Sequence, residues 1–264
     1  MSEHVTICEV GPRDGLQMAK GRMPTVVKTR WIAALASAGL PQIEVGSFVP
    51  ASVIPQLVDT PEIVRRAVLL PRVTIQALAP NLRGAQGAYA AGAHRISIPV
   101  SVSLGHSRAN LNRTPDEQVA EVSRMVAWLR AQPRHVPVEA ACSTAFGCSI
   151  DGVVAESEVV RIATALAEAG VDDLSLADTG GYGNPAMIRS GVRAVRAAVG
   201  PVLKALHLHD TCGVGPDHAL AGLDEGLRKF DSALAGLGGC PYAPGDSGHI
   251  VTAVVLCRDN AKLL

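Results

Sequence analysis

The sequence predicts a single α/β domain of the TIM (β/α)8 barrel class, covering residues 1–264. Three observations lead to this prediction: a glycine-marked joint that recurs along the chain, eight strand-like apolar runs separated by helix-length segments, and the length itself. One barrel of this class typically needs about 250 residues. A doubly wound sheet is the weaker alternative, because no G-x-G-x-x-G pattern follows the first apolar run.

The recurring joint is visible in four segments: "SAGLPQIEV" (37–45), "AAGAHRISI" (90–98), "EAGVDDLSL" (168–176) and "DEGLRKFDS" (224–232). Each segment reads as a helix end, a glycine, a short turn and a strand. The glycine stands where a helix C-terminus needs a left-handed residue, at Gly39, Gly92, Gly170 and Gly226. The repeat therefore predicts helices that alternate with strands.

The expected strands are the apolar runs 5–10, 42–47, 73–78, 95–100, 136–141, 173–178, 203–209 and 230–236. Helix starts agree with this order. Thr60, Thr114 and Asn184 each precede a proline and can cap a helix whose first residue is that proline. Glu117 completes a capping box with Thr114.

Composition and charge narrow the functional classes. Lys plus Arg equals Asp plus Glu at 24 each, so no net charge attracts nucleic acid or an anionic membrane. No apolar run approaches the about 18 residues of a membrane span, and the N-terminus lacks a signal-peptide pattern. Six scattered cysteines without a C-x-x-C pair indicate a reducing compartment. We expect a cytoplasmic protein that binds a small molecule, with neither nucleic acid nor a membrane as partner.

Polar residues recur five positions after the joint glycines, at Glu44, Ser97, Ser175 and Asp231. Alternation along a strand sends such side chains to the face opposite the helices, which in a barrel is the interior. Two interpretations stay open from this pattern. The residues form a hydrogen-bonded core network, or they line a polar pocket at the carboxyl ends of the strands.

Two histidines end the seventh expected strand, in "LHLHD" (206–210). His207 and His209 share one face and could bind a divalent metal, although packed or solvated histidines give the same pattern. Asp14, after the first strand, would reach the same mouth, because strands seven, eight and one are neighbours in a closed barrel. A carboxylate with two imidazoles and open positions suits Mg²⁺, Mn²⁺ or another octahedral ion.

Two loops carry the other candidate residues. In "EVGPRDGLQ" (9–17), Arg13 would remain a fixed positive charge beside the metal. The usual alternative for such a dipeptide is a surface ion pair between Arg13 and Asp14. The flanking glycines and proline, and the position at a strand end, argue against this alternative. The loop "GLGGCPYAPGDSGH" (236–249) has five glycines and two prolines around Cys240. Such a loop can close over a site. Its cysteine could be an acid, a base or a nucleophile, although many cysteines are merely packed.

Five segments together resemble the 3-hydroxy-3-methylglutaryl-CoA (HMG-CoA) lyase family of metal-dependent TIM barrels: "EVGPRDGLQ", "IEVGSFVPASVIPQLVD", "LSLADTGGYG", "LHLHDTCG" and "AGLGGCPYAPGDSG". The resemblance runs from about Val5 to about Gly248. "GPRDGLQ" is shared more loosely with the related acyl-CoA Claisen synthases, whereas "GLGGCPYA" is closer to the lyases. The resemblance implies retro-Claisen cleavage of a 3-hydroxyacyl-CoA thioester to acetyl-CoA and a keto acid, which is acetoacetate if the substrate is HMG-CoA.

The resemblance also implies residue roles. Asp14, His207 and His209 would bind the metal, and Arg13 would stabilise the enolate that develops on the thioester. Cys240, on a mobile loop, would transfer a proton to the acetyl-CoA carbanion. The other matched positions would be supporting carboxylates, pocket residues and a basic residue near the CoA nucleotide, namely Asp178, Glu44, Gln17, Ser47, Ser175 and Lys20.

The sequence departs from the family at its C-terminal side. His249 stands where the family usually has a metal-binding asparagine; we expect His249 to ligate, and a preference for a softer ion is an open hypothesis. Ala253 and Val254 occupy positions where carboxylates are expected, and the family's closing helices are expected to be absent. A shortened gene product, a divergent lyase and a degenerate CoA-ester-binding barrel compete as explanations. The otherwise intact motifs favour a functional lyase.

Substrate and assembly stay open at this stage. HMG-CoA is the default substrate, and a related tertiary thioester such as citramalyl-CoA needs only a reshaped pocket. The rival of another class is a barrel that binds CoA esters or metal without catalysis. The family often dimerises, so a homodimer is a further expectation. Four histidines outside the matched motifs are expected to be solvated or to cap helices: His94, His106, His135 and His218.

Overall fold

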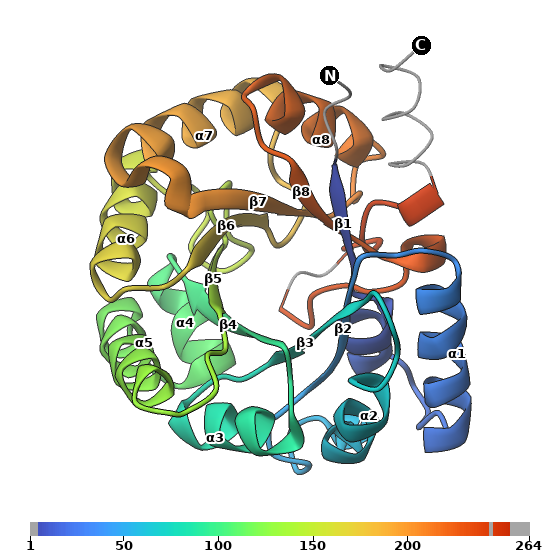
Figure 1. Cartoon of the computed structure of the whole chain (residues 1–264). Helices are drawn as coiled ribbons and strands as arrows, with labels where there is room; N and C mark the ends of the chain where they lie inside the picture. The colour runs from blue at the N-terminus through green and yellow to red at the C-terminus, as the bar shows by residue number, and fades with distance from the viewer. Residues whose placement is uncertain (1–4, 243–244, 254–264) are drawn as a thin grey trace.

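The computed structural model describes residues 5–242 and 245–253. Within them, eight parallel strands close into a barrel, each pairing with the next along the chain and β8 pairing with β1. Figure 1 shows helices placed around the outside of this barrel. The strands are β1 (Thr6–Glu9), β2 (Gln42–Ser47), β3 (Thr74–Leu78), β4 (Arg95–Ser101), β5 (Val138–Ser143), β6 (Asp173–Asp178), β7 (Leu203–Leu208) and β8 (Lys229–Ser232). The prediction of a TIM barrel is confirmed.

The helices alternate with the strands, as the repeat predicts. They are α1 (Thr25–Ser37), α2 (Thr60–Ala67), α3 (Leu82–Ala91), α4 (Leu104–Leu111), α5 (Pro115–Arg130), α6 (Glu156–Glu168), α7 (Pro185–Val199) and α8 (Gly215–Asp224). Both α4 and α5 lie between β4 and β5, so α4 is an insertion in the loop that follows β4. Short helical turns are η1 (Gly11–Gly15), η2 (Pro55–Leu57), η3 (Gly200–Val202) and η4 (Leu234–Gly236).

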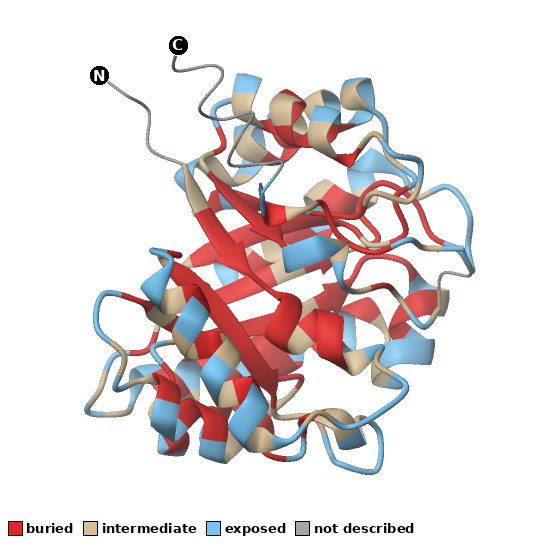
Figure 2. Ribbon diagram, turned by 90° about the vertical axis from the view of Figure 1, so that its right-hand side faces the viewer, coloured by how far each residue is buried: buried red, intermediate tan, exposed pale blue. Residues whose placement is uncertain are grey.

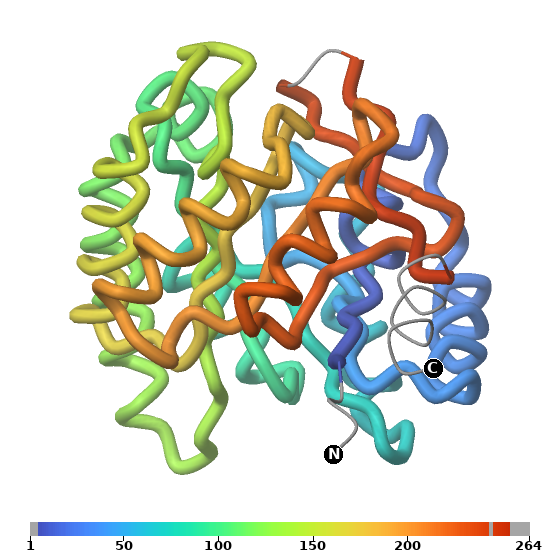
Figure 3. Tube along the Cα trace, turned by 90° about the horizontal axis from the view of Figure 1, so that it is seen from above, coloured from blue at the N-terminus to red at the C-terminus, as the bar shows by residue number. Residues whose placement is uncertain are grey.

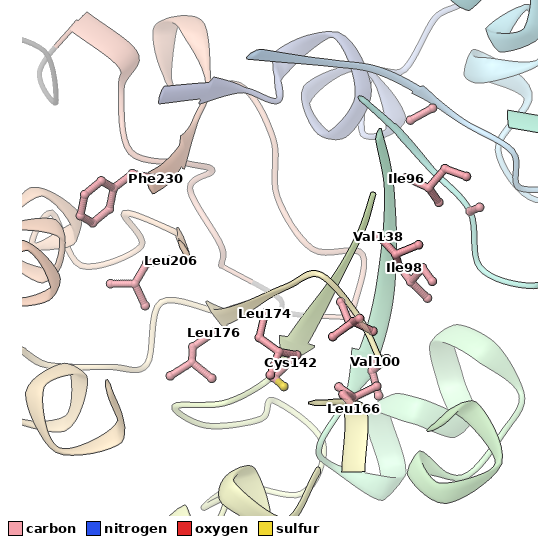
Figure 4. Close-up of a cluster of buried hydrophobic side chains, with 14 of the residues drawn as sticks. Ile96, Ile98, Val100, Val138, Cys142, Leu166, Leu174, Leu176, Leu206 and Phe230 are labelled. Carbon is pink, nitrogen blue, oxygen red and sulfur yellow. The ribbon is translucent and has the colours of Figure 1, made fainter. Parts of the chain in front are cut away.

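Small aliphatic side chains form the core between the strands and the helices. Figure 2 shows the strands as mostly buried, while the outer helices alternate between buried and exposed residues. In Figure 4, Ile96, Ile98 and Val100 lie along β4, and Leu174 and Leu176 lie along β6; all five are fully buried. Each such side chain contributes about 1.5–3 kcal/mol when it leaves water. Only 3% of the residues are aromatic, so the core is packed mainly by aliphatic side chains.

The four joint glycines adopt the left-handed conformation that the repeat predicts. Their φ angles are 91°, 96°, 85° and 84° at Gly39, Gly92, Gly170 and Gly226. A side chain would be strained there. Each glycine therefore reverses the chain from a helix into the next strand.

Two of the three predicted caps are confirmed. Thr114 and Glu117 form a complete capping box at the start of α5, and the Asn184 side chain accepts hydrogen bonds from the first turn of α7. Thr60 as an N-cap was wrong: Asp59 is the N-cap, and Thr60 is the first residue of α2. The Thr60 hydroxyl accepts a hydrogen bond from the Ser47 amide, so it fastens the helix to the end of β2 instead.

The eighth strand is shorter than the sequence predicts. β8 ends at Ser232, and Ala235 has a φ of 58° within η4. The chain turns there because the Glu9 carboxylate accepts a hydrogen bond from the Leu234 amide. Beyond the turn, the segment at 249–252 returns to this end of the barrel, where Ala233 pairs with Val251. This return places His249 at the barrel mouth.

The α5 cap gives a test of the fold. Replacing Thr114 with Ala removes the hydroxyl that accepts from the Glu117 amide, so we expect the free energy of unfolding to fall by about 1 kcal/mol. Thr114→Ser keeps a hydroxyl and should change stability by much less. Urea denaturation followed by circular dichroism measures both. Equal losses in the two variants would show that the capping hydrogen bond is not the cause.

Candidate active site and metal centre

Four candidate ligands meet at the carboxyl ends of the strands. Asp14 lies in η1 immediately after β1, His207 is in β7, His209 follows that strand, and His249 comes from the returning segment. One ligand atom from each lies within 4.8 Å of those from the other three. The structure thus brings together all four residues that the sequence analysis assigned to a metal.

The distances within the cluster show that the Nε2 atoms of the three histidines and a carboxylate oxygen of Asp14 face one another. The His207 Nε2 atom lies 3.3 Å from the Nε2 atom of His209 and 3.2 Å from that of His249. The Asp14 Oδ2 atom lies 2.9 Å from the His249 Nε2 atom and 3.5 Å from the His207 Nε2 atom. Three imidazole nitrogens and one carboxylate oxygen therefore surround a single point.

The other ring nitrogen of each histidine faces an oxygen acceptor. Asp231 Oδ2 lies 3.0 Å from Nδ1 of His207, Asp246 Oδ2 lies 2.6 Å from Nδ1 of His209, and the Leu237 carbonyl oxygen lies 2.8 Å from Nδ1 of His249. A carbonyl or carboxylate oxygen can only accept, so the proton of each neutral ring belongs on Nδ1. All three Nε2 atoms then present lone pairs to the common point.

This donor set fits a divalent cation. Three lone pairs and a carboxylate oxygen at hydrogen-bond distance repel one another unless a positive charge lies between them. Nδ1–H groups held by carboxylates and carbonyls are the usual outer partners of metal-binding histidines. Asp14, His207, His209 and His249 would hold the ion, and Asp231 and Asp246 would orient two of the rings.

The charges at the site are set by burial and by close partners. Burial alone would raise the pKa of Asp14, but the charge of Arg13 and the contact with His249 outweigh it and hold that pKa well below its usual range. Burial lowers the pKa of His209 to about 4, and the neighbouring His249 adds to the shift. Burial acts the same way on His207, but Asp231 and Asp14 outweigh it and raise the pKa. Asp14 is therefore ionised, and His209 is neutral at pH 7, which are the protonation states that metal binding would need.

Arg13 is fixed between two carboxylates. Its Nη1 atom lies 2.7 Å from the Asp14 carboxylate, and its Nε atom donates to Glu44, whose other oxygen accepts from the Ser97 hydroxyl. Burial would lower the pKa of Arg13, yet Asp14 and Glu44 together raise it. Arg13 is therefore a permanently charged group that two carboxylates hold beside the cluster.

The loop after β8 joins Cys240 to the cluster. The Asp246 Oδ2 atom that faces His209 also accepts a hydrogen bond of 2.6 Å from the Cys240 amide. Figure 3 shows the red segment that follows β8 next to the yellow-green loop that follows β5, where the Ser149 hydroxyl donates to the Tyr242 carbonyl oxygen. The loop therefore crosses the mouth and is anchored on both sides of it.

A family model described as HMGL-like matches residues 4–256. The chain belongs to the HMG-CoA lyase family. The mitochondrial hydroxymethylglutaryl-CoA lyase of Arabidopsis thaliana is 40% identical over 97% of this chain and 54% of its own length, and the mitochondrial lyase of mouse is 38% identical over 96% and 77%. A solved HMG-CoA lyase from Acinetobacter baumannii, in complex with coenzyme A and 3-methylmalate, superposes with a TM-score of 0.93, at 35% identity over 99% of this chain and 85% of that one.

The chain thus spans about half the length of the Arabidopsis relative and about three quarters of the mouse lyase. In the part of the chain that the structure describes, no helix has both the length and the apolar character to cross a membrane. Ala253, expected at a carboxylate position of the family, is exposed, and Val254 lies outside the described residues.

The other residues matched to the family occupy different surroundings. Gln17 donates a 2.5 Å hydrogen bond to Asp14, so it touches the cluster directly. Ser175 is fully buried, and its hydroxyl has no hydrogen-bond partner among the described residues. The hydroxyl of the buried Ser47 accepts from the Val49 amide, while Lys20 is exposed. The roles assigned to these residues stay predictions.

The two supporting carboxylates differ from each other. Glu44 lies within β2 rather than after it and binds Arg13, as described above. Asp178 is the last residue of β6, and its two oxygens accept from the Tyr182 and Gly183 amides. Asp178 therefore holds the loop between β6 and α7, and none of its hydrogen bonds reaches the metal ligands.

Two histidines expected to be solvated or to cap a helix are buried. His106 is 3% exposed and contacts Cys240 and Ser101, and His218 is fully buried near Asp178. The expectation was wrong because both lie on helices, α4 and α8, whose inner faces cover the strand ends. Sequence analysis also did not identify Asp246 as a partner of His209, because only the fold of its loop brings the two together.

Gly238 supplies a test of the His249 position. A Cβ atom at Gly238 would lie 2.1 Å from the His249 Nδ1 atom, so Gly238→Ala must displace that ring. We expect metal affinity to fall about 10–100-fold, as for loss of an outer partner of a ligand. Isothermal titration of the metal-free protein with Mn²⁺ measures the change.

Gly245→Ala is the matched control. Gly245 has a positive φ of 89° in the same loop, but nothing lies within 4 Å of its added Cβ. Gly245→Ala therefore introduces the strain of a positive φ at an alanine, as Gly238→Ala does, but its Cβ atom does not collide with a neighbouring side chain. Equal affinity losses in both variants would contradict a specific role for the His249 position.

Proposed function

We propose that this chain is a metal-dependent carbon–carbon lyase that cleaves HMG-CoA to acetyl-CoA and acetoacetate. The observation that carries the proposal is the meeting of three histidines, Asp14 and the fixed guanidinium of Arg13 at the mouth of a barrel whose relatives are named as HMG-CoA lyases. A site that combines metal ligands with a fixed cation suits an acyl-CoA thioester carrying a carboxylate and a hydroxyl group.

The reaction needs three events at the substrate. The C3 hydroxyl loses its proton, the electron pair of the C2–C3 bond moves onto C2 to give an enolate, and C2 then gains a proton. No proton is gained or lost overall. Asp14, His207, His209 and His249 would hold the metal, which would supply a positive charge that makes the C3 hydroxyl more acidic.

Arg13 stabilises the enolate. Its contacts with Asp14 and Glu44 use the Nη1 and Nε nitrogens, which leaves Nη2 to donate to the thioester oxygen. Because both carboxylates fix the guanidinium before substrate arrives, no reorganisation is needed as the negative charge develops. Loss of one such donor typically costs about 10²–10³-fold in kcat.

Cys240 is the proton donor to C2. It lies on the loop that crosses the mouth, and Asp246 connects its backbone amide to His209. The loop also excludes water from the carbanion, which protects it from protonation at the wrong step.

A second substrate is favoured by one comparison. The solved relative from Acinetobacter baumannii holds coenzyme A with 3-methylmalate, a branched hydroxy diacid. The alternative substrate for this chain is a related 3-hydroxyacyl-CoA of another branched hydroxy diacid. Citramalyl-CoA, the tertiary member of this class, requires the same bond cleavage in a differently shaped pocket.

Turnover of a thioester panel tests the proposal. Purified protein with Mn²⁺ or Mg²⁺ is incubated with HMG-CoA and citramalyl-CoA, and acetyl-CoA is followed by mass spectrometry. We expect cleavage of one thioester that stops with a chelator and returns with added metal. Absence of cleavage with all thioesters and metals would favour the non-catalytic CoA-ester-binding barrel.

Substitutions at two residues separate the enzyme from that rival. Cys240→Ser should lose most turnover while it keeps acyl-CoA binding, because the hydroxyl is a far weaker acid than the thiol. Arg13→Lys should lower kcat by about 10²-fold, because Lys cannot contact both carboxylates and the enolate at once. Near-normal turnover in Arg13→Lys would refute the oriented-charge role.

The metal is proposed to be a transition-metal ion such as Zn²⁺ or Mn²⁺ in preference to Mg²⁺. Mg²⁺ favours oxygen ligands, whereas imidazole suits transition metals, and three of the four candidate ligands here are imidazoles. Protein dialysed against equal Mg²⁺ and Mn²⁺ should retain Mn²⁺ by elemental analysis. His249→Asn should move that ratio toward Mg²⁺. Retention of Mg²⁺ by the unsubstituted protein would contradict this preference.

A cytoplasmic setting and a homodimer complete the proposal. The first rests on the scattered cysteines without a C-x-x-C pair. The second rests on the family resemblance alone. Cell fractionation and sedimentation analysis, respectively, test them.

A further inference from the structure

An additional histidine faces the proposed proton donor. The His106 Nε2 atom lies 3.7 Å from the Cys240 Sγ atom, a hydrogen-bond distance for sulfur. His106 is on α4, the helix inserted after β4, and only 3% of it is exposed. The Ser103 side chain caps α4 and accepts from the His106 amide, so the first turn of the helix fixes where the ring enters the site.

The far side of the ring is fixed as well. The His106 Nδ1 atom lies 2.8 Å from the hydroxyl of Ser101, the last residue of β4, which is fully buried. When the Ser101 hydroxyl donates to Nδ1, the ring proton lies on Nε2 and points at the sulfur. Ser101, His106 and Cys240 then form a chain of hydrogen bonds from the barrel wall to the loop after β8.

The surroundings favour a neutral imidazole. Burial lowers the pKa of His106, and the charge of Asp151 only partly opposes this shift. Asp151 is itself occupied by the Ser103 hydroxyl and the Gly105 amide, each at 2.7 Å. The Tyr242 ring packs edge-on against His106 with centroids 5.6 Å apart. The ring is thus an oriented hydrogen-bond donor rather than a second charge.

We propose that His106 is a positioning residue for Cys240, which it serves by donating a hydrogen bond from Nε2–H to the sulfur. This inference rests on the proposed role of Cys240. When the thiol gives its proton to C2, the sulfur becomes a thiolate, and the His106 hydrogen bond stabilises that negative charge. The substrate hydroxyl releases one proton to water, and the thiolate takes one proton back from water after it has protonated C2, so the cycle closes with no net change in protons.

The reactivity of the Cys240 thiol tests the contact without any turnover. Each protein is treated with iodoacetamide across a range of pH, and alkylation of the Cys240 peptide is quantified by mass spectrometry. The exposed Cys212 serves as an internal reference. In His106→Phe, we expect the pH midpoint of Cys240 alkylation to rise by about one unit, because the thiolate loses its donor. Alkylation of Cys212 should not change.

Two further variants control for shape. His106→Gln keeps an N–H donor on a side chain of similar reach and should restore most of the Cys240 reactivity, which also covers the case in which the phenylalanine variant fails to fold. His135→Phe replaces an exposed histidine and should leave Cys240 unchanged. A folded His106→Phe protein with an unchanged alkylation midpoint would overturn the inference.

Turnover separates this inference from the proposed function. If the unsubstituted protein cleaves a thioester, His106→Phe should lower kcat by about 10-fold or more while KM changes less, because the donor acts on the proton-transfer step. Cleavage that is normal in His106→Phe would remove the role of His106 and leave the lyase intact. If no thioester is cleaved, the proposed function fails, and the alkylation result still decides whether His106 acts on the thiol.

Discussion

The repulsion among three imidazole lone pairs and one carboxylate is the constraint on which the rest of the site depends. Asp231, Asp246 and the Leu237 carbonyl oxygen hold the protons of the three rings on Nδ1, so the Nε2 atoms converge with nothing to neutralise them but a cation. A site arranged in this way is costly in the absence of metal. Binding of the ion offsets this unfavourable electrostatic free energy, so metal binding is coupled to the stability of the barrel mouth.

The same constraint explains why distant parts of the chain meet. His249 reaches the cluster because the segment after η4 turns back and pairs beside Ala233, and Glu9 fastens this return by accepting from Leu234 and Thr252. Asp246 then connects His209 to the Cys240 amide. The candidate ligands, Cys240 and the loop after β8 are therefore one hydrogen-bonded unit rather than separate features.

Local rules in the sequence were enough to predict the barrel and most of the cluster. The joint glycines and caps depend on a few neighbouring residues, and alternation alone placed Glu44, Ser175 and Asp231 inside. His207 and His209 were identified because strand geometry fixes their spacing. The partners of these residues depend on loops that close over long sequence distances, such as Asp246 with His209 and His106 with Cys240, which no short-range pattern specifies. The end of β8 was mispredicted for the same reason, since the Glu9 carboxylate that stops it lies 225 residues away.

X-ray absorption spectroscopy of Mn²⁺- or Zn²⁺-loaded protein tests whether a divalent ion lies among the three imidazoles and Asp14. Imidazole rings give a multiple-scattering pattern that counts them. We predict three imidazoles and at least one oxygen ligand around the metal. A first shell with two or fewer imidazoles would contradict the account, because it would leave at least one of His207, His209 and His249 outside the centre that the whole mouth is built to hold.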